Sequence, residues 1–171
     1  MTMTFTEVQR FNQRWLWIML ILTLLVLIGV FGYGLVQQLL LGVPWGERPM
    51  SDTGLILVGS ATILFSGGMI HLFRTLRLIT EVRPEGLYIR YYPLYRKTIP
   101  YHTITSCEAR TYKPLSEYGG WGIKYGRSGW AYNVVGNQGV QLVLDNGKRI
   151  LVGSQRAKEL ERAIKLYCKT S

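Results

Sequence analysis

The side chains that act as catalytic groups in enzymes are few and scattered in this sequence. His102 is the only histidine in the second half of the chain, in the turn-like run Pro100–Thr103. Glu108, Glu117 and Asp145 are not spaced as a paired general acid and base. The two cysteines lie outside any CxxC or Cys/His metal pattern. We therefore predict no catalytic activity, no metal ion and no cofactor.

Residues suited to recognition are concentrated in a segment rich in glycine and aromatic residues, residues 118–132. Glycine permits close approach of the backbone to a neighbour, and aromatic rings supply contact area. The rings either pack onto the domain's own wall, which we favour on pattern alone, or form a recognition surface. The segment has no GxGxxG phosphate loop. The candidate partner-binding residues are Tyr118, Trp121, Tyr125 and Trp130.

Two uncharged stretches in the first half of the chain are long enough to cross a membrane. The first covers residues 15–36, and at 1.5 Å per residue it exceeds the roughly 30 Å hydrocarbon core. It is too long for a secretory signal peptide and has no cleavage-site pattern after it. The second lies between Asp52 and Arg74. Its small residues, which let another helix approach closely, are Gly59, Thr62 and Ser66. We predict a transmembrane hairpin.

The arginines around these stretches predict the orientation of the hairpin. Arg10 and Arg14 precede the first stretch, and three arginines follow the second, whereas the connection between the stretches contains only Arg48. By the positive-inside rule, both chain termini are expected in the cytoplasm.

The net charge of +10 arises in the second half of the chain, where most of the twenty Lys and Arg side chains lie. A basic domain held beside a bilayer meets anionic lipid headgroups first, at roughly 1 kcal/mol per cation near the surface. Anionic lipid is therefore a better expected partner than nucleic acid. The candidate lipid contacts follow the second apolar stretch: Arg74, Arg77 and Arg83.

After Arg74 the apolar residues recur with the period of two that is typical of half-buried strands. Seven strands are expected, nearly all antiparallel, near residues 77–82, 87–92, 96–99, 105–112, 122–134, 139–145 and 148–153, the fifth long enough to be broken. Asn146-Gly147 is a hairpin turn signal. A closing amphipathic helix is predicted by a Ser154 cap and the helical spacing of Ala157, Leu160, Ile164 and Tyr167.

Three segments resemble those of uncharacterised bacterial membrane proteins that have two N-terminal transmembrane helices and a pleckstrin-homology-like (PH-like) cytoplasmic domain. They are Glu81–Leu87, Tyr118–Ile123 and Gly153–Gln155. The resemblance covers most of residues 54–168 and implies a fold and a bacterial plasma-membrane location, but no activity. The loop at Arg83–Gly86 has one cation, unlike the long basic loop of phosphoinositide-binding PH domains.

The sequence thus predicts an α+β membrane protein with three parts. These are a cytoplasmic tail over residues 1–14, a transmembrane hairpin over 15–73, and a PH-like cytoplasmic domain over 74–171, a seven-stranded antiparallel barrel with a C-terminal helix. The expected function is a non-enzymatic binding or scaffold module that presents its domain to a protein partner at the cytoplasmic leaflet. The alternative is a domain that senses anionic lipid.

Overall fold

The chain forms two compact units in the computed structural model, which describes residues 5–168. The helical unit consists of residues 12–74, and the β unit combines the chain up to Phe11 with the chain from Thr75 onward. Residues 1–4 and 169–171, which belong to the predicted tail and the predicted cytoplasmic domain, lie outside the described part.

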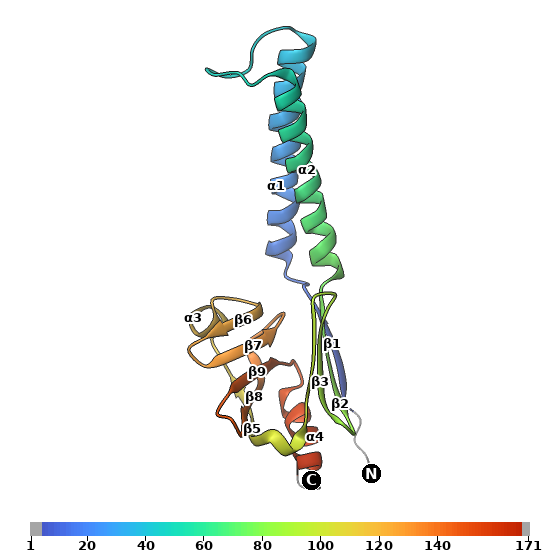
Figure 1. Cartoon of the computed structure of the whole chain (residues 1–171), viewed down its shortest axis with the longest axis vertical. Helices are drawn as coiled ribbons and strands as arrows, with labels where there is room; N and C mark the ends of the chain where they lie inside the picture. Colours follow the sequence, from blue (N-terminus) through green and yellow to red (C-terminus); the bar gives the residue numbers. More distant parts are fainter. Residues whose placement is uncertain (1–4, 169–171) are drawn as a thin grey trace. The chain divides into compact units, whose positions relative to one another are not determined.

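The helical unit contains two helices that are long and apolar enough to cross a membrane (Figure 1). Helix α1 covers Arg14–Leu35 and continues into a π-helical segment, η1, at Val36–Leu40. Helix α2 covers Asp52–Thr75. Almost none of the side chains in their most apolar parts are buried. The two uncharged stretches therefore form helices at the predicted positions.

Small residues allow aromatic side chains to pack tightly in the helical unit. A Cβ atom at Gly59 of α2 would lie 3.0 Å from the Phe31 ring of α1, so Gly59 is a point of close approach. A Cβ atom at Gly34 would lie 2.6 Å from the ring of Trp45. In the connection, the Gln38 side-chain amide donates to the Asp52 carboxylate at 2.7 Å. Helix association through a small-residue face thus has a structural basis at Gly59.

The β unit begins with a four-stranded antiparallel sheet in the order β1-β2-β3-β4. Its strands are β1 (Thr6–Arg10), β2 (Arg77–Arg83), β3 (Gly86–Tyr92) and β4 (Tyr95–Ile99). Strands β2 to β4 follow one another along the chain, and β1 joins from before the helical unit by pairing with β2. The inner face carries fully buried Leu78, Leu87 and Ile89.

A second sheet has five strands in the order β5-β8-β9-β7-β6 (Figure 1). Its strands are β5 (Ile104–Thr111), β6 (Gly122–Gly126), β7 (Gly129–Asn133), β8 (Gln138–Leu144) and β9 (Arg149–Gly153). A short 3-10 turn, η2 (Tyr101–Thr103), precedes β5, and a one-turn helix, α3 (Pro114–Tyr118), precedes β6. All neighbours are antiparallel except β7 and β9, which run parallel.

The strand count and the sheet closure differ from the seven-stranded antiparallel barrel expected from the sequence. The described residues form nine strands in two open sheets, one of which contains a parallel pair. The predicted strand at residues 122–134 is the hairpin of β6 and β7, broken at a turn. The segment expected to be a tail contains strand β1. It was not predicted as a strand because Thr6–Arg10 has little apolar character and gains its structure by pairing with β2.

The C-terminal helix α4 (Ala157–Cys168) packs against β5 and β8, as its apolar stripe predicts. Leu160 and Ile164 are fully buried. The Arg156 backbone N–H donates to Ser154 Oγ at 3.0 Å, so Ser154 contributes to the start of the helix.

Strand β1 is also bound to the chain leading into α4. The Glu7 carboxylate accepts hydrogen bonds from the Ser154 hydroxyl and from the Gln155 N–H, the latter at 2.9 Å. The buried Gln9 amide donates to the Gly153 carbonyl at 2.8 Å. These contacts join the segment before α1 to the last strand of the second sheet, so residues 6–10 are an integral part of the β unit.

Candidate functional site

The β6–β7 hairpin holds the two most exposed rings of the glycine-rich and aromatic segment side by side. Tyr125 and Trp130 are directly opposite each other in the strand register, and their ring centroids lie 5.3 Å apart. Tyr125 is 72% exposed and Trp130 is 42% exposed. Cross-strand neighbours share one face of a sheet. Two of the four predicted aromatic residues thus form one exposed surface.

Two glycines fix the hairpin against its neighbours. A Cβ atom at Gly129, where φ is +94°, would lie 2.2 Å from the Arg149 carbonyl oxygen of β9. A Cβ atom at Gly126 would lie 2.0 Å from the Glu117 carbonyl oxygen of α3. Only glycine fits such close approaches of backbone to backbone. These two glycines therefore help to place the aromatic rings of the hairpin.

The exposed rings border a pocket of about 400 Å³ between the β6–β7 turn and the β8–β9 turn. Arg127 comes from the first turn, and Lys148 and Arg149 come from the second turn and the start of β9. None of the lining residues is acidic: Tyr125, Arg127, Gly129, Trp130, Asn146, Gly147, Lys148 and Arg149. In the described part of the chain these three cations form no ion pair. We refer to this feature as the aromatic-basic pocket.

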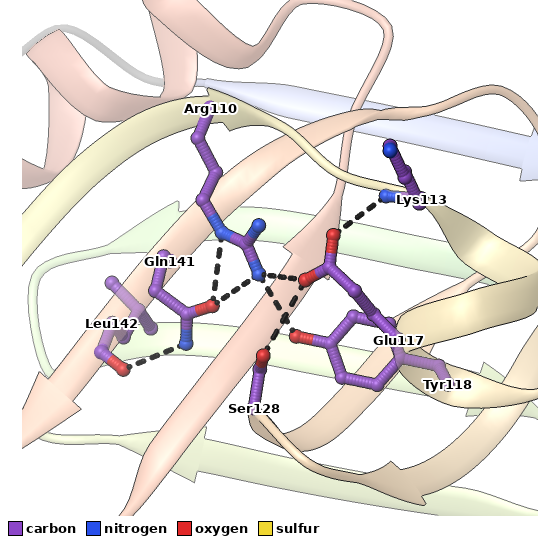
Figure 2. Close-up of polar contacts among 7 residues, drawn as sticks. All are labelled: Arg110, Lys113, Glu117, Tyr118, Ser128, Gln141 and Leu142. Atoms are coloured by element: carbon purple, nitrogen blue, oxygen red, sulfur yellow. Dashed lines mark hydrogen bonds and ion pairs between the residues drawn. The ribbon is translucent and has the colours of Figure 1, made fainter.

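A polar cluster links the β6–β7 turn to α3 and to strands β5 and β8 (Figure 2). Arg110 of β5 forms an ion pair with Glu117 of α3 at 2.7 Å, and its guanidinium also donates to Gln141 Oε1 of β8. The second Glu117 oxygen accepts the Lys113 backbone N–H at 2.7 Å, and Ser128 in the β6–β7 turn donates to Glu117 at 3.4 Å. The cluster therefore connects α3 and the hairpin turn to strands β5 and β8 at one edge of the second sheet.

The Glu117 carboxylate gives this cluster a defined pH dependence. The hydrogen bond from Arg110 holds the pKa of Glu117 below its usual value of 4.5. A lowered pKa in the folded state stabilises the fold above the unfolded-state pKa, and this contribution is lost as the pH falls through the folded-state pKa.

Glu117→Gln is accordingly expected to lower the free energy of unfolding by about 1 kcal/mol at neutral pH. The difference from the unmodified protein should shrink as the pH falls below 4.5 and Glu117 itself becomes protonated. Urea unfolding of the full chain in nonionic detergent, followed by hydrogen exchange of the β6–β7 amides, measures the destabilisation at neutral pH and its decrease at acidic pH. A destabilisation that is equal at neutral and acidic pH would contradict this role of the ion pair.

The other two predicted aromatic residues lie elsewhere in the β unit. Tyr118 is buried, and its ring packs edge-on against Tyr112 with centroids 5.9 Å apart. As the last residue of α3, it packs into the interior in the same cluster as Ala131 and Leu151, and so it is not part of the exposed surface of Tyr125 and Trp130. Trp121 is partly buried, and its indole N–H donates to the Gly136 carbonyl at 2.9 Å.

Two of the three predicted lipid-contact arginines, Arg77 and Arg83, are not brought together. Arg74 belongs to the last turn of α2, whereas Arg77 and Arg83 are the first and last residues of β2. The latter two are six steps apart along an extended strand, which separates them by roughly 20 Å. Arg83 is also engaged locally, because it pairs with Glu81 at 2.7 Å and lies 3.7 Å from the centroid of the Tyr88 ring.

The pocket cations were not identified as site residues from the sequence. Lys148 and Arg149 meet Tyr125 and Trp130 because β7 runs parallel to β9, with Trp130 in register with Ile150. Arg127 instead lies in the turn that joins β6 and β7. The closeness of Lys148 and Arg149 to the aromatic segment depends on this non-local pairing and has no signal in the sequence, whereas Arg127 lies within residues 118–132 and could have been singled out.

The groups considered for catalysis stay separate in the structure. His102 lies exposed in η2, and Cys107 is buried in β5. Burial raises the pKa of the Cys107 thiol to about 12, so it is protonated at neutral pH and is a poor nucleophile. Between residues 5 and 168, no group of three His, Cys, Asp or Glu side chains is placed to hold a metal ion.

Comparison with known proteins identifies a family but no characterised relative. No curated protein and no solved structure matched the chain. A family model described as a family of unknown function, DUF6141, matches residues 1–169, which span both the helical unit and the β unit. The chain therefore belongs to the DUF6141 family, whose function is unknown.

Proposed function

We propose that this protein is a membrane-anchored, non-enzymatic binding module whose β unit holds an acidic segment of a protein partner in the aromatic-basic pocket. The observation that carries the proposal is the pocket itself. It combines two exposed, adjacent rings with three cations and has no acidic lining residue. An extended acidic peptide with an apolar side chain would complement both features.

The pocket has the chemistry of a protein-binding surface. Trp, Tyr and Arg are the residues that most often dominate the binding energy of protein interfaces. Uncompensated cations steer an acidic partner and reject basic ones. Small-molecule sites, by contrast, are mostly apolar and enclosed, whereas much of this wall is cation and turn backbone. These considerations favour a peptide segment over a small metabolite.

Membrane anchoring is supported by the surface of the two long helices. Large apolar side chains are exposed along both, including Leu22 and Leu25 of α1 and Leu64 and Phe65 of α2. Such contiguous apolar surface is costly in water and is suited to lipid. The arginine distribution favours cytoplasmic termini, and the resemblance described above favours a bacterial plasma membrane with a PH-like β unit. In that fold, α4 would be the helix that covers one end of the strands.

Accessible-cysteine labelling tests the topology. In a chain lacking Cys107 and Cys168, Glu47→Cys is expected to react with an impermeant thiol reagent added to intact cells, because the connection between the helices would lie outside. Asn146→Cys should react only after the cells are lysed. The reverse pattern would contradict the orientation, and equal labelling of both positions in intact cells would contradict membrane anchoring with a cytoplasmic β unit.

Photocrosslinking in native membranes tests the binding function. With benzoylphenylalanine in place of Trp130, we expect an adduct whose crosslinked peptide, identified by mass spectrometry, is acidic. The same probe in place of Lys158 on the exposed side of α4 is the control and should give no such adduct.

The charges of the pocket provide the decisive comparison. The double variant Lys148→Glu and Arg149→Glu is expected to remove the adduct formed from position 130, whereas Lys158→Glu with Arg162→Glu on α4 should leave it intact. An adduct that forms equally from both probe positions, or that survives reversal of the pocket charges, would contradict the proposal.

A further inference from the structure

Four arginines share one face of the first sheet of the β unit. Arg10 is directly opposite Arg77 in the β1–β2 register, and Arg90 is directly opposite Arg96 in the β3–β4 register. The strands alternate, so that Leu78, Ile89 and Tyr91 point into the core from the other face. The four side chains are therefore presented together on the outer face, and we refer to them as the arginine face.

The spacing of these arginines is tight. Side chains directly opposite each other have Cβ atoms about 4.5–5.5 Å apart. Arg77 and Arg90 also lie against the same ring, with guanidinium carbons 4.7 Å and 4.8 Å from the centroid of Tyr92. Tyr92 thus brings the two arginine pairs together into a single cationic surface.

No carboxylate in the described part of the chain compensates this surface. The nearest acidic residue on the same face, Glu81, is opposite Tyr88 and is engaged by Arg83 at 2.7 Å. Like charges placed directly opposite each other destabilise a sheet. Two such pairs on adjacent strands are therefore unfavourable unless an anion binds between them.

The Arg77 side chain has an unused hydrogen-bond donor. Its Nε is buried and has no hydrogen-bond partner in the structure. A buried donor without an acceptor costs stability. The Nε–H and one Nη–H of a guanidinium form a fork that matches two oxygens of a phosphate group. A phosphate group is an acceptor that this guanidinium fork would fit.

The connections of the strands favour a membrane lipid as the source of the phosphate. Strand β1 ends at Arg10, four residues before the start of α1, and β2 begins at Arg77, two residues after the end of α2. At no more than about 3.6 Å per residue, both side chains belong to the chain immediately flanking the apolar helices. If those helices cross a membrane, this part of the chain lies at the level of the lipid headgroups.

We infer that the arginine face binds the phosphate group of an anionic phospholipid at the membrane surface. This site rests on the membrane anchoring proposed above and is independent of the aromatic-basic pocket. Of the arginines predicted from the sequence to contact lipid, Arg77 belongs to this face, whereas Arg83 lies at the far end of β2 and pairs with Glu81. A bound lipid would lower the repulsion within the arginine face and thereby stabilise the β1–β2 pairing between the two helices.

Native mass spectrometry of the full chain in nonionic detergent tests this site. The probes are dioctanoyl-phosphatidylglycerol, dioctanoyl-phosphatidylcholine and inorganic phosphate. The unmodified protein should bind phosphatidylglycerol in preference to phosphatidylcholine, and millimolar phosphate should not displace it. Arg10→Gln with Arg96→Gln, two exposed positions, should weaken phosphatidylglycerol binding by about tenfold or more, because cations near a lipid surface each contribute substantially.

Two further variants distinguish a specific phosphate site from non-specific electrostatic attraction to anionic lipid. Lys158→Gln with Arg162→Gln on α4 removes the same charge and should leave lipid binding unchanged. Arg77→Lys keeps the charge but removes the guanidinium fork, and it should also weaken phosphatidylglycerol binding.

Equal loss in the α4 control, absence of preference between the two lipids, or displacement by inorganic phosphate would each overturn the lipid site. The membrane anchoring is tested separately by reconstituting the same protein into lipid nanodiscs. A protein that enters nanodiscs but does not prefer phosphatidylglycerol overturns only the lipid site, whereas a protein that does not enter them overturns both.

Discussion

Leu160→Ala is expected to lower the free energy of unfolding of the β unit by about 2–5 kcal/mol, the usual cost of truncating a buried leucine. Leu160 is fully buried on the side of α4 that packs against β5 and β8. The substitution leaves a cavity that rigid sheet neighbours cannot fill. The effect should be seen as faster hydrogen exchange of β8 and β9 amides in the full chain, measured in nonionic detergent.

Lys158→Ala is the matched control, because it truncates a long side chain on the exposed side of the same helix. It should change the free energy of unfolding by no more than about 0.5 kcal/mol. If Leu160→Ala were no more destabilising than Lys158→Ala, α4 would not be part of the core of the β unit.

Trp130→Ala is expected to reduce recovery of the partner from membranes by about 30-fold, which corresponds to about 2 kcal/mol for an interface hot spot. The ring is 42% exposed and borders the aromatic-basic pocket, so its loss removes contact area that a partner would cover. The melting temperature of the full chain in detergent should change little. Co-purification after crosslinking and a thermal melt measure the two effects.

Tyr132→Ala is the matched control for this prediction. Tyr132 lies two residues further along β7, is buried, and stacks on Tyr95 of β4 with centroids 5.5 Å apart. Its removal should destabilise the β unit and thereby lower partner recovery indirectly. A large drop in melting temperature for Trp130→Ala as well would mean that Trp130 is a structural residue.

The elements with strong local signals could be predicted from the sequence. Helices α1 and α2 could be predicted from the two uncharged stretches, because the length and apolar character of each stretch can be read from the sequence without knowing what packs against it. Strands β2, β3 and β8 alternate clearly, and α4 has an apolar stripe at Leu160 and Ile164. In each case the periodicity of apolar residues matches the burial that the structure shows.

Features that depend on contacts between distant segments could not be predicted. Strand β1 has a polar sequence and is recognisable only through its pairing with β2 and the Glu7 and Gln9 contacts near the start of α4. The parallel pairing of β7 with β9 has no local signature either. A sequence pattern reports which face of a strand is buried, but not which strand lies beside it.

The candidate site was predicted only in part, because it too depends on contacts between segments that are distant in sequence. The aromatic composition of residues 118–132 identified the hairpin, but it could not separate exposed Trp130 from buried Tyr118. That distinction depends on α3, whose last turn directs Tyr118 toward Tyr112. The arginine face was missed because Arg10 and Arg77 are far apart in sequence and become neighbours only through β1.

The central claim is that Tyr125 and Trp130 act together, beside the pocket cations, to hold an acidic protein segment. The most direct test places benzoylphenylalanine at position 125 and compares the yield of the partner adduct in native membranes with Trp130 intact and with Trp130→Ala. We predict an adduct to an acidic peptide with the intact ring and a yield reduced by about tenfold or more without it. An unchanged yield in a folded protein would contradict the claim that this pocket binds the partner.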